Sequence, residues 1–183
     1  MTAPEIGVLA LQGGVAEHLR MLEDVGARPR TVRTAAALDG LDGIVLPGGE
    51  SSTIDRLLRR FGMFAPLQSA LAEGLPALAT CAGLILLARE VLDPAPDQHS
   101  LGALDVTVRR NAFGRQIDSV AETISTRLGS GTVAYIRAPR VEEVGPGVEI
   151  LARRGAPVAD ASAPLVAVAT DSILALGFHP ELT

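Results

Sequence analysis

Residues 75–87 of the chain read LPALATCAGLILL. Residues 75–80 form a short apolar run that predicts a buried strand, and residues 82–91 are apolar on nearly every face and predict a buried helix. Two earlier apolar runs, residues 6–11 and 43–46, are likewise followed by segments of helical period. This alternation of strand and helix indicates parallel β/α units.

The same patterns predict the rest of the chain. Further helices are expected over residues 15–25, 52–61 and 64–73. Further strands are expected over residues 30–33, 103–108, 132–136, 148–153, 165–170 and 173–178, with a loop over 93–100 and no more than a turn at 129–131. Because no linker separates the two halves, we expect one α/β domain over residues 1–183, with helices flanking a mixed, mostly parallel sheet.

The composition excludes several classes of function. The net charge is −5 and aromatic residues make up only 3%, which argues against nucleic-acid binding through a basic patch or a stacking platform. The first residues contain neither a basic region nor an apolar stretch long enough to span a bilayer, so we expect no membrane segment and a cytoplasmic protein. A single cysteine fits a reducing compartment and leaves Cys81 to be explained by packing or by chemistry.

Cys81 has the surroundings of a nucleophile elbow. Small residues two positions away on either side, Ala79 and Gly83, allow a strand and a helix to meet in a tight turn at the carboxyl edge of the sheet. A helix N-terminus favours a thiolate and can stabilise a developing oxyanion. The alternative is that Cys81 is simply a small buried apolar residue, and this segment alone does not decide between the two.

The sequence His179-Pro180-Glu181 offers partners for such a nucleophile. The strand over residues 173–178 would bring His179 to the end of a strand, where α/β sheets present reactive groups. Pro180 favours extended backbone at His179, and residues two apart on extended backbone project to the same side, so Glu181 could hold the imidazole. Without Cys81, the same segment would more often be an exposed turn.

Residues 46–52, LPGGESS, form a second strand-to-helix turn. Gly48 and Gly49 permit positive φ and bring N–H groups close to a substrate. An ordinary turn with Ser52 as N-cap and Asp55 as its partner is the alternative, and both descriptions can hold. The sequence contains no Walker loop, dinucleotide fingerprint, hydrolase serine motif or clustered Cys/His pattern, so it gives little support to nucleotide or metal chemistry.

Together these motifs resemble those of the class I glutamine amidotransferases, and more closely the PdxT/SNO family of pyridoxal 5′-phosphate synthase glutaminase subunits. The resemblance extends over the whole chain, in the segments 7–13, 17–18, 46–52, 80–83, 110–116, 136–139 and 178–182. RNAFGRQ at 110–116 and IRAP at 136–139 single out this family, because the other segments fit many amidotransferases. Ala79 stands where the family commonly has Gly, a change that a negative φ would tolerate.

The resemblance implies a fold, an activity and a site. The fold is the three-layer, flavodoxin-like α/β fold of class I glutamine amidotransferases. The activity is hydrolysis of L-glutamine to L-glutamate and ammonia without a cofactor or metal. The ammonia passes to a barrel-shaped synthase subunit, in a large hetero-oligomer that makes vitamin B6. The implied catalytic triad is Cys81, His179 and Glu181, and the implied glutamine contacts are Gly48, Gly49, Glu50, Arg110, Ile136 and Arg137.

Three other functions stay open at this point. A glutaminase of another pathway would share the triad but lack the segment at residues 110–116. A cysteine hydrolase of related fold would not need the Gly48-Gly49-Glu50 turn. A partner-binding module could keep the fold without turnover, although the intact triad residues argue against it.

Overall fold

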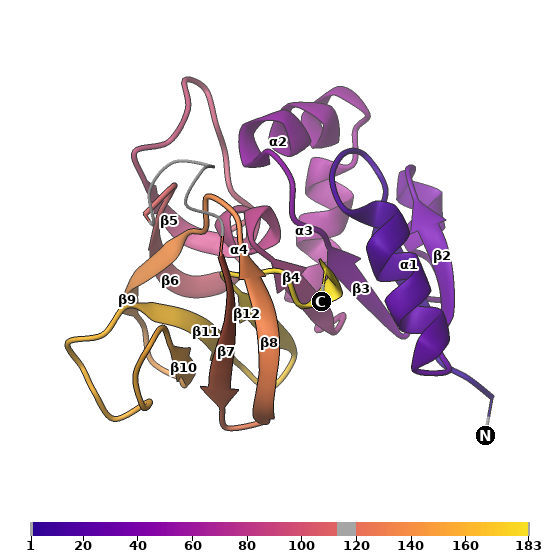
Figure 1. The fold of residues 1–183 in the computed structure, drawn as a ribbon. Coiled ribbons are helices and arrows are strands. Elements are labelled where there is room, and N and C mark those ends of the chain that lie inside the picture. Colours follow the sequence, from indigo (N-terminus) through magenta and orange to yellow (C-terminus); the bar gives the residue numbers. More distant parts are fainter. Residues whose placement is uncertain (1, 113–119, 183) are drawn as a thin grey trace.

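A computed structural model describes residues 2–112 and 120–182 (Figure 1). Its main feature is a ten-stranded sheet with the strand order β2-β1-β3-β4-β12-β11-β9-β6-β5, to which β10 is added by pairing with β11. The strands of this sheet are β1 (Glu5–Leu9), β2 (Arg28–Val32), β3 (Gly43–Leu46), β4 (Ala77–Thr80), β5 (Ala88–Leu92), β6 (Leu104–Arg109), β9 (Arg140–Val144), β10 (Glu149–Arg153), β11 (Leu165–Ala169) and β12 (Ile173–Leu176).

The first half of the chain follows the predicted β/α alternation. Strands β1, β2, β3, β4 and β12 run parallel to their neighbours within this group. Because of this, the loops that follow β1, β3, β4 and β12 meet at one edge of the sheet. The helices are α1 (Val15–Asp24), α2 (Ser51–Arg60), α3 (Phe64–Ala72) and α4 (Ala82–Leu87), with a short 3₁₀ helix, η1 (Ala35–Leu38), after β2.

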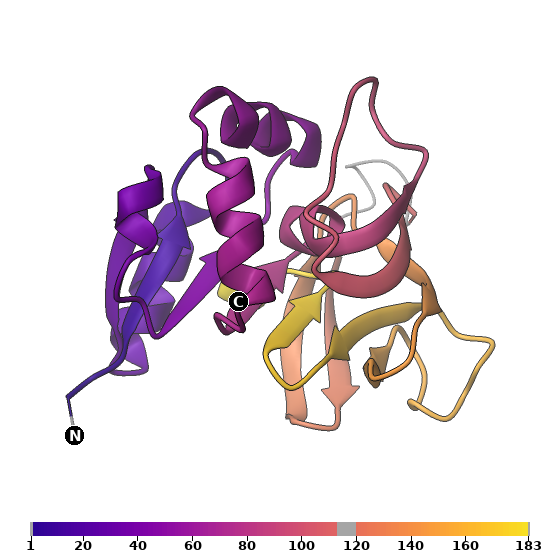
Figure 2. The same cartoon turned by 180° about the vertical axis from the view of Figure 1, so that it is seen from behind.

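Helices cover both faces of this parallel region. Val8 and Val45 contact Leu22 of α1 on one face, whereas their chain neighbours Leu9 and Ile44 belong to the larger core that includes α2 and α3. Successive strand residues point to opposite faces, so continuous apolar runs are what a sheet covered on both sides requires. Figures 1 and 2, which view the molecule from opposite sides, show α1 in front of the sheet and α3 behind it.

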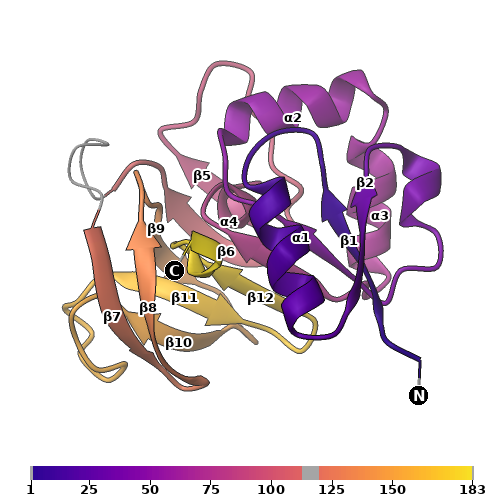
Figure 3. The same ribbon diagram turned by 45° about the vertical axis from the view of Figure 1, so that its right-hand side comes forward.

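The second half of the chain adds antiparallel strands. β12, β11, β9 and β6 pair antiparallel in that order, and β5 then pairs parallel with β6. A separate hairpin, β7 (Val120–Thr126) and β8 (Gly129–Tyr135), stands beside the C-terminal turn (Figure 3). The expected mixed α/β sheet with flanking helices is confirmed. Of the described helices, none combines the length and the apolar character needed to cross a membrane.

Several predicted boundaries in the second half were wrong. Residues 129–131 are not just a turn but the start of β8, and strands β7 and β9 were not expected. In the β7 sequence, VAETIST, exposure alternates along the strand, and Ile124 is buried between the exposed Thr123 and Ser125. Polar Glu122 and Thr126 share the side of Ile124, so the sequence lacks the apolar alternation that predicts a half-buried strand. Only its pairing with β8 defines it as a strand.

The helix predicted over residues 82–91 is also shorter than expected. It ends at Leu87, because Ala88 adopts φ −57° and ψ 144° and begins β5. A continuous apolar run cannot by its period distinguish a buried helix from a buried strand. Here the pairing of β5 with β6, from Ala88↔Leu104 onward, decides the conformation.

Candidate active site

One cleft of about 440 Å³ lies at the edge where the loops after the parallel strands meet. The loops after β1, β3, β4 and β12 contribute to it, and further residues come from the segments after β6 and β8. The nine residues proposed from the sequence all line this cleft, although they are spread over more than 130 positions of the chain: Gly48, Gly49, Glu50, Cys81, Arg110, Ile136, Arg137, His179 and Glu181.

Cys81 occupies a strained turn between β4 and α4. Its φ of 47° and ψ of −99° are uncommon for a residue with a side chain, and such a conformation costs about 1–3 kcal/mol. A backbone hydrogen bond of 2.7 Å from the Cys81 N–H to the Leu176 carbonyl oxygen holds the turn. The Cys81 sulfur lies 3.8 Å from the Ile136 carbonyl oxygen, and Cys81 is only 6% exposed. Ala79 has a negative φ within β4, which is the condition under which alanine is tolerated where the family commonly has glycine.

His179 is held by both its backbone and its ring. The backbone exchanges hydrogen bonds with Ala134 of β8 at 2.9 and 3.3 Å. The Nδ1 atom lies 2.7 Å from Glu181 Oε1. Extended backbone was the expected reason for this contact, and that reason was wrong: Pro180–Leu182 form a 3₁₀ helix, which folds the carboxylate back against the ring.

The electrostatics of this pair favour a charged imidazole. Burial alone would lower the pKa of His179, but its hydrogen bonds to Cys81 and Glu181 outweigh burial and raise the pKa to about 10. Burial likewise would raise the pKa of Glu181, yet the hydrogen bond with His179 holds it below its usual value. At neutral pH the ring is therefore an imidazolium between a sulfur and a carboxylate.

This raised pKa predicts a pH dependence of stability. Because the pKa of His179 is about 10 in the folded protein and near 6.5 ordinarily, protonation favours the folded state. The contribution is complete below pH 6.5 and is lost as the pH rises towards 10. We expect the difference in free energy of unfolding between the wild type and His179→Asn to shrink over this range, as measured by urea denaturation at a series of pH values. A difference that stays constant would contradict the assigned charge.

Gly48 contacts the catalytic histidine candidate directly. A Cβ atom at this position would lie 2.2 Å from His179 Cε1, and one at Gly49 would lie 2.5 Å from the side-chain oxygen of Gln12. Neither glycine has a positive φ, so the expectation that they provide left-handed backbone was wrong. They are needed because only glycine leaves space for the neighbouring side chains.

We expect Gly48→Ala to lower the glutaminase kcat by about 100-fold, because a displacement of about 1 Å in a reacting group can have that effect. The added methyl group would displace the His179 ring from its position in the cleft. Gly131→Ala is the matched control, since a Cβ there meets nothing within 4 Å and its φ is not positive. Steady-state kinetics would check both variants, and a normal kcat for Gly48→Ala would contradict the steric argument.

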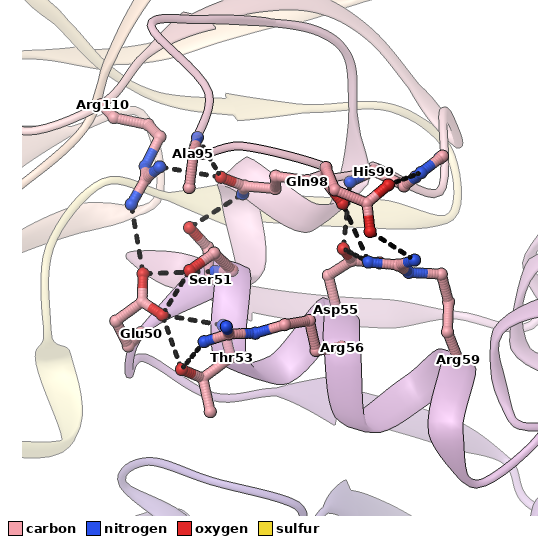
Figure 4. A network of polar contacts seen from close by, with 12 residues as sticks. Glu50, Ser51, Thr53, Asp55, Arg56, Arg59, Ala95, Gln98, His99 and Arg110 are labelled. Carbon is pink, nitrogen blue, oxygen red and sulfur yellow. Dashed lines mark hydrogen bonds and ion pairs between the residues drawn. The ribbon is translucent and has the colours of Figure 1, made fainter.

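Glu50 caps helix α2. Its carboxylate accepts hydrogen bonds from the backbone N–H groups of Ser52 and Thr53 and from both of their hydroxyl groups, at 2.6–3.2 Å (Figure 4). Ser52 was an expected N-cap and is instead a residue of the helix. Asp55, its expected partner, binds Arg59. Burial alone would raise the pKa of Glu50, but these hydrogen bonds lower it to about 2, so the carboxylate is ionised.

Arg110 connects this cap to the loop between β5 and β6. Its guanidinium lies 3.1 Å from Glu50 Oε1 and donates to Gln98 Oε1 at 2.8 Å. Gln98 in turn donates to the Ser51 hydroxyl at 3.0 Å, and the backbone N–H of His99 binds Asp55 (Figure 4). The network holds the Glu50 carboxylate and the Arg110 guanidinium side by side in the cleft.

Comparisons with known proteins identify the family of the chain. Residues 8–183 match the SNO glutamine amidotransferase family. The chain belongs to this family. A SNO-family assignment confirms the resemblance found in the sequence.

Two relatives of the chain carry the same description. The chain is 54% identical to "Pyridoxal 5'-phosphate synthase subunit PdxT" of Cutibacterium acnes, over 99% of this chain and 91% of that protein. The Kineococcus radiotolerans protein of the same name is 57% identical, over 99% and 89%. A solved "glutamine amidotransferase" structure is 43% identical, with a TM-score of 0.87 and coverage of 97% and 91%. PurLQS from Thermotoga maritima, at 17% identity, a TM-score of 0.69 and coverage of 99% and 89%, shares the fold.

Six residues of the family motifs line the cleft but were not proposed as site residues: Gln12, Gly13, Glu17, Ser51, Asn111 and Leu182. Gln12 accepts a 2.7 Å hydrogen bond from the Glu50 backbone N–H, and Asn111 has a positive φ of 49°. The position of Gln12 just after a parallel strand was a usable signal, because the loops that follow parallel strands meet at one edge of the sheet. Residues 113–116 of the family segment at 110–116 lie outside the described residues. In the described part of the chain, no group of three or more His, Cys, Asp or Glu residues is placed to hold a metal ion.

Proposed function

We propose that the chain hydrolyses L-glutamine to L-glutamate and ammonia and supplies the ammonia to a synthase subunit for pyridoxal 5′-phosphate synthesis. The observation that carries this proposal is the hydrogen bond between Cys81 and an imidazolium that Glu181 orients, within a cleft that also holds the Glu50–Arg110 ion pair. Family membership and the names of the relatives support the same substrate.

The proposed reaction begins with the Cys81 thiolate. It attacks the side-chain carbonyl carbon of glutamine, and backbone N–H groups near Gly49 and Ala82 stabilise the oxyanion. His179 gives its proton to the departing nitrogen, which leaves as ammonia and produces a thioester. The imidazole then takes a proton from water as the water attacks the thioester, so glutamate forms and the thiolate and imidazolium are restored.

The charged residues of the cleft suit the backbone end of glutamine. Free glutamine carries an α-carboxylate and an α-ammonium group, and Arg110 and Glu50 offer one charge of each opposite sign, 3.1 Å apart. In this proposal they fix the amino acid while its side chain reaches Cys81. Gly48, Gly49, Ile136 and Arg137 form the surrounding walls.

The partner and the location complete the proposal. The chain would work as one glutaminase domain over residues 1–183, in the cytoplasm, docked on a barrel-shaped synthase subunit in a large hetero-oligomer. The names of the relatives, each a subunit of pyridoxal 5′-phosphate synthase, support this partner. A glutaminase of another pathway is less well supported, because eight relatives that are 50–57% identical to this chain share one name.

Amide-¹⁵N-labelled glutamine tests the proposed function. The chain is mixed with a pyridoxal 5′-phosphate synthase subunit, a pentose phosphate and a triose phosphate, and the product is analysed by mass spectrometry. The label is expected in the pyridine nitrogen of the product. Absence of both labelled product and glutamate would overturn the proposal, provided that the same synthase makes the cofactor from added ammonium.

A further inference from the structure

The Glu17-His18 pair is a family motif to which the proposed mechanism assigns no role. His18 lies on α1 and is completely buried, at 0% exposure. Its Nε2 atom lies 3.0 Å from Thr80 Oγ1 and 3.5 Å from Glu181 Oε1. An aliphatic side chain would fill this space without the cost of burying a polar ring, so the contacts call for an explanation.

Both contacts of His18 lead to the active-site cleft. Glu181, whose side chain is 1% exposed, binds the Nδ1 atom of His179 through the same Oε1 atom that faces His18. Thr80 directly precedes Cys81, and its hydroxyl oxygen accepts a 2.9 Å hydrogen bond from the Gly48 N–H. The His18 ring therefore contacts both Glu181, which orients His179, and Thr80, which holds the Gly48 turn.

The surroundings of His18 determine which nitrogen carries the proton. Burial is the main effect that lowers its pKa, so the ring is neutral. Nδ1 has no hydrogen-bond partner among the described residues. A proton on Nδ1 would be buried without an acceptor, and the Nε2 lone pair would then face the Glu181 carboxylate. We therefore assign the proton to Nε2, which donates towards Thr80 Oγ1 and Glu181 Oε1.

We infer that His18 is a positioning residue, which fixes Glu181 relative to the Thr80–Gly48 contact and so sets the angle at which the His179 ring meets Cys81. Glu181, which His18 contacts directly, binds the Nδ1 atom of the His179 ring, and Gly48, which Thr80 connects to His18, packs against its Cε1 atom. A small shift of Glu181 or Gly48 is transmitted to the ring, because Glu181 is hydrogen-bonded to it and Gly48 lies directly against it. This role rests on the proposed glutaminase function.

Two substitutions separate positioning from packing. His18→Leu fills the buried space but removes the donor, whereas His18→Gln keeps an N–H group near the position of Nε2. In the complex with the synthase subunit, we expect His18→Leu to lower kcat for glutamine by about 10- to 100-fold with KM changed less than about twofold, because a misplaced catalytic group affects turnover rather than binding. His18→Gln is expected to recover most of the lost kcat.

Leu22→Ala is the matched control. Leu22 lies one turn further along α1 and packs against Val8 and Val45, away from Glu181. It is expected to lower the melting temperature at least as much as His18→Leu while leaving kcat unchanged. The inference would be overturned by a normal kcat in His18→Leu or by a kcat that does not recover in His18→Gln. It would also be overturned if Leu22→Ala lowered kcat in proportion to its loss of stability.

Alkylation of Cys81 gives a readout that does not depend on glutamine hydrolysis. Cys81 is the single cysteine of the chain, so modification by iodoacetamide at neutral pH reports on this thiol alone. His18→Leu is expected to slow the modification by about tenfold and His18→Gln to restore it, because a misaligned imidazolium stabilises the thiolate less well. Equal rates in all variants would overturn the role of His18. If the wild type releases no glutamate even with the synthase, the proposed function fails, while the alkylation rates still decide the role of His18.

Discussion

Replacement of Cys81 by alanine is expected to lower glutamate release in the presence of the synthase subunit by about 10⁴-fold or more, since loss of a nucleophile leaves only binding and oxyanion stabilisation. The cleft offers no substitute: no other cysteine exists in the chain, and Ser51 is a buried residue of α2 bonded to Gln98. Measurement of glutamate from glutamine over hours would quantify the residual rate. Retention of more than a few per cent of activity would remove Cys81 from its role.

The same variant carries its own control. Synthesis of the cofactor from added ammonium should proceed normally with Cys81→Ala, because only the glutamine-dependent step is lost. The double variant Cys81→Ala/His179→Asn should be hardly slower than either single variant, since residues that act as a unit give strongly non-additive effects. Additive losses would indicate that Cys81 and His179 act in separate steps, despite the hydrogen bond between them.

The second large effect is expected for Arg110→Met. Removal of the guanidinium takes away the proposed partner of the substrate α-carboxylate and leaves Glu50 without its cation. Loss of a charged hydrogen bond typically costs about 2–3 kcal/mol, which corresponds to a decrease of about 30- to 150-fold in kcat/KM for glutamine. We expect this decrease mainly as a higher KM, because Arg110 would hold the part of the substrate that does not react.

Arg127→Met provides the control for Arg110→Met. Arg127 also forms an ion pair, with Glu149 at 2.7 Å, but it lies at the exposed end of the β7–β8 hairpin. The two substitutions therefore change net charge and side-chain shape equally. Initial rates over a range of glutamine concentrations would compare them. Equal values of kcat/KM in both variants would exclude Arg110 from glutamine binding.

Much of the fold and the site could be predicted from local sequence. Helices α1, α2 and α3 begin and end within one or two residues of the predicted boundaries, because their amphipathic period is a short-range signal. The position of Cys81 between a strand and a helix was also evident, since small residues flank it on both sides. The common location of Cys81, His179 and the Gly48–Glu50 turn followed from one rule, that the ends of parallel strands meet at one edge. Arg110, Ile136 and Arg137 follow β6 and β8 and were implied only by the family resemblance.

What the sequence by itself determined is thus the β/α alternation, the identity of the reactive residues and their placement at the strand ends, all of which depend on neighbours along the chain. Only the tertiary structure decided where α4 stops, why Gly48 must be glycine, how a 3₁₀ turn brings Glu181 to His179, and that His18 lies beneath both. These features depend on contacts between residues that are far apart in the sequence. The energies of such contacts come from close packing and burial in three dimensions, and no local pattern of residues encodes them.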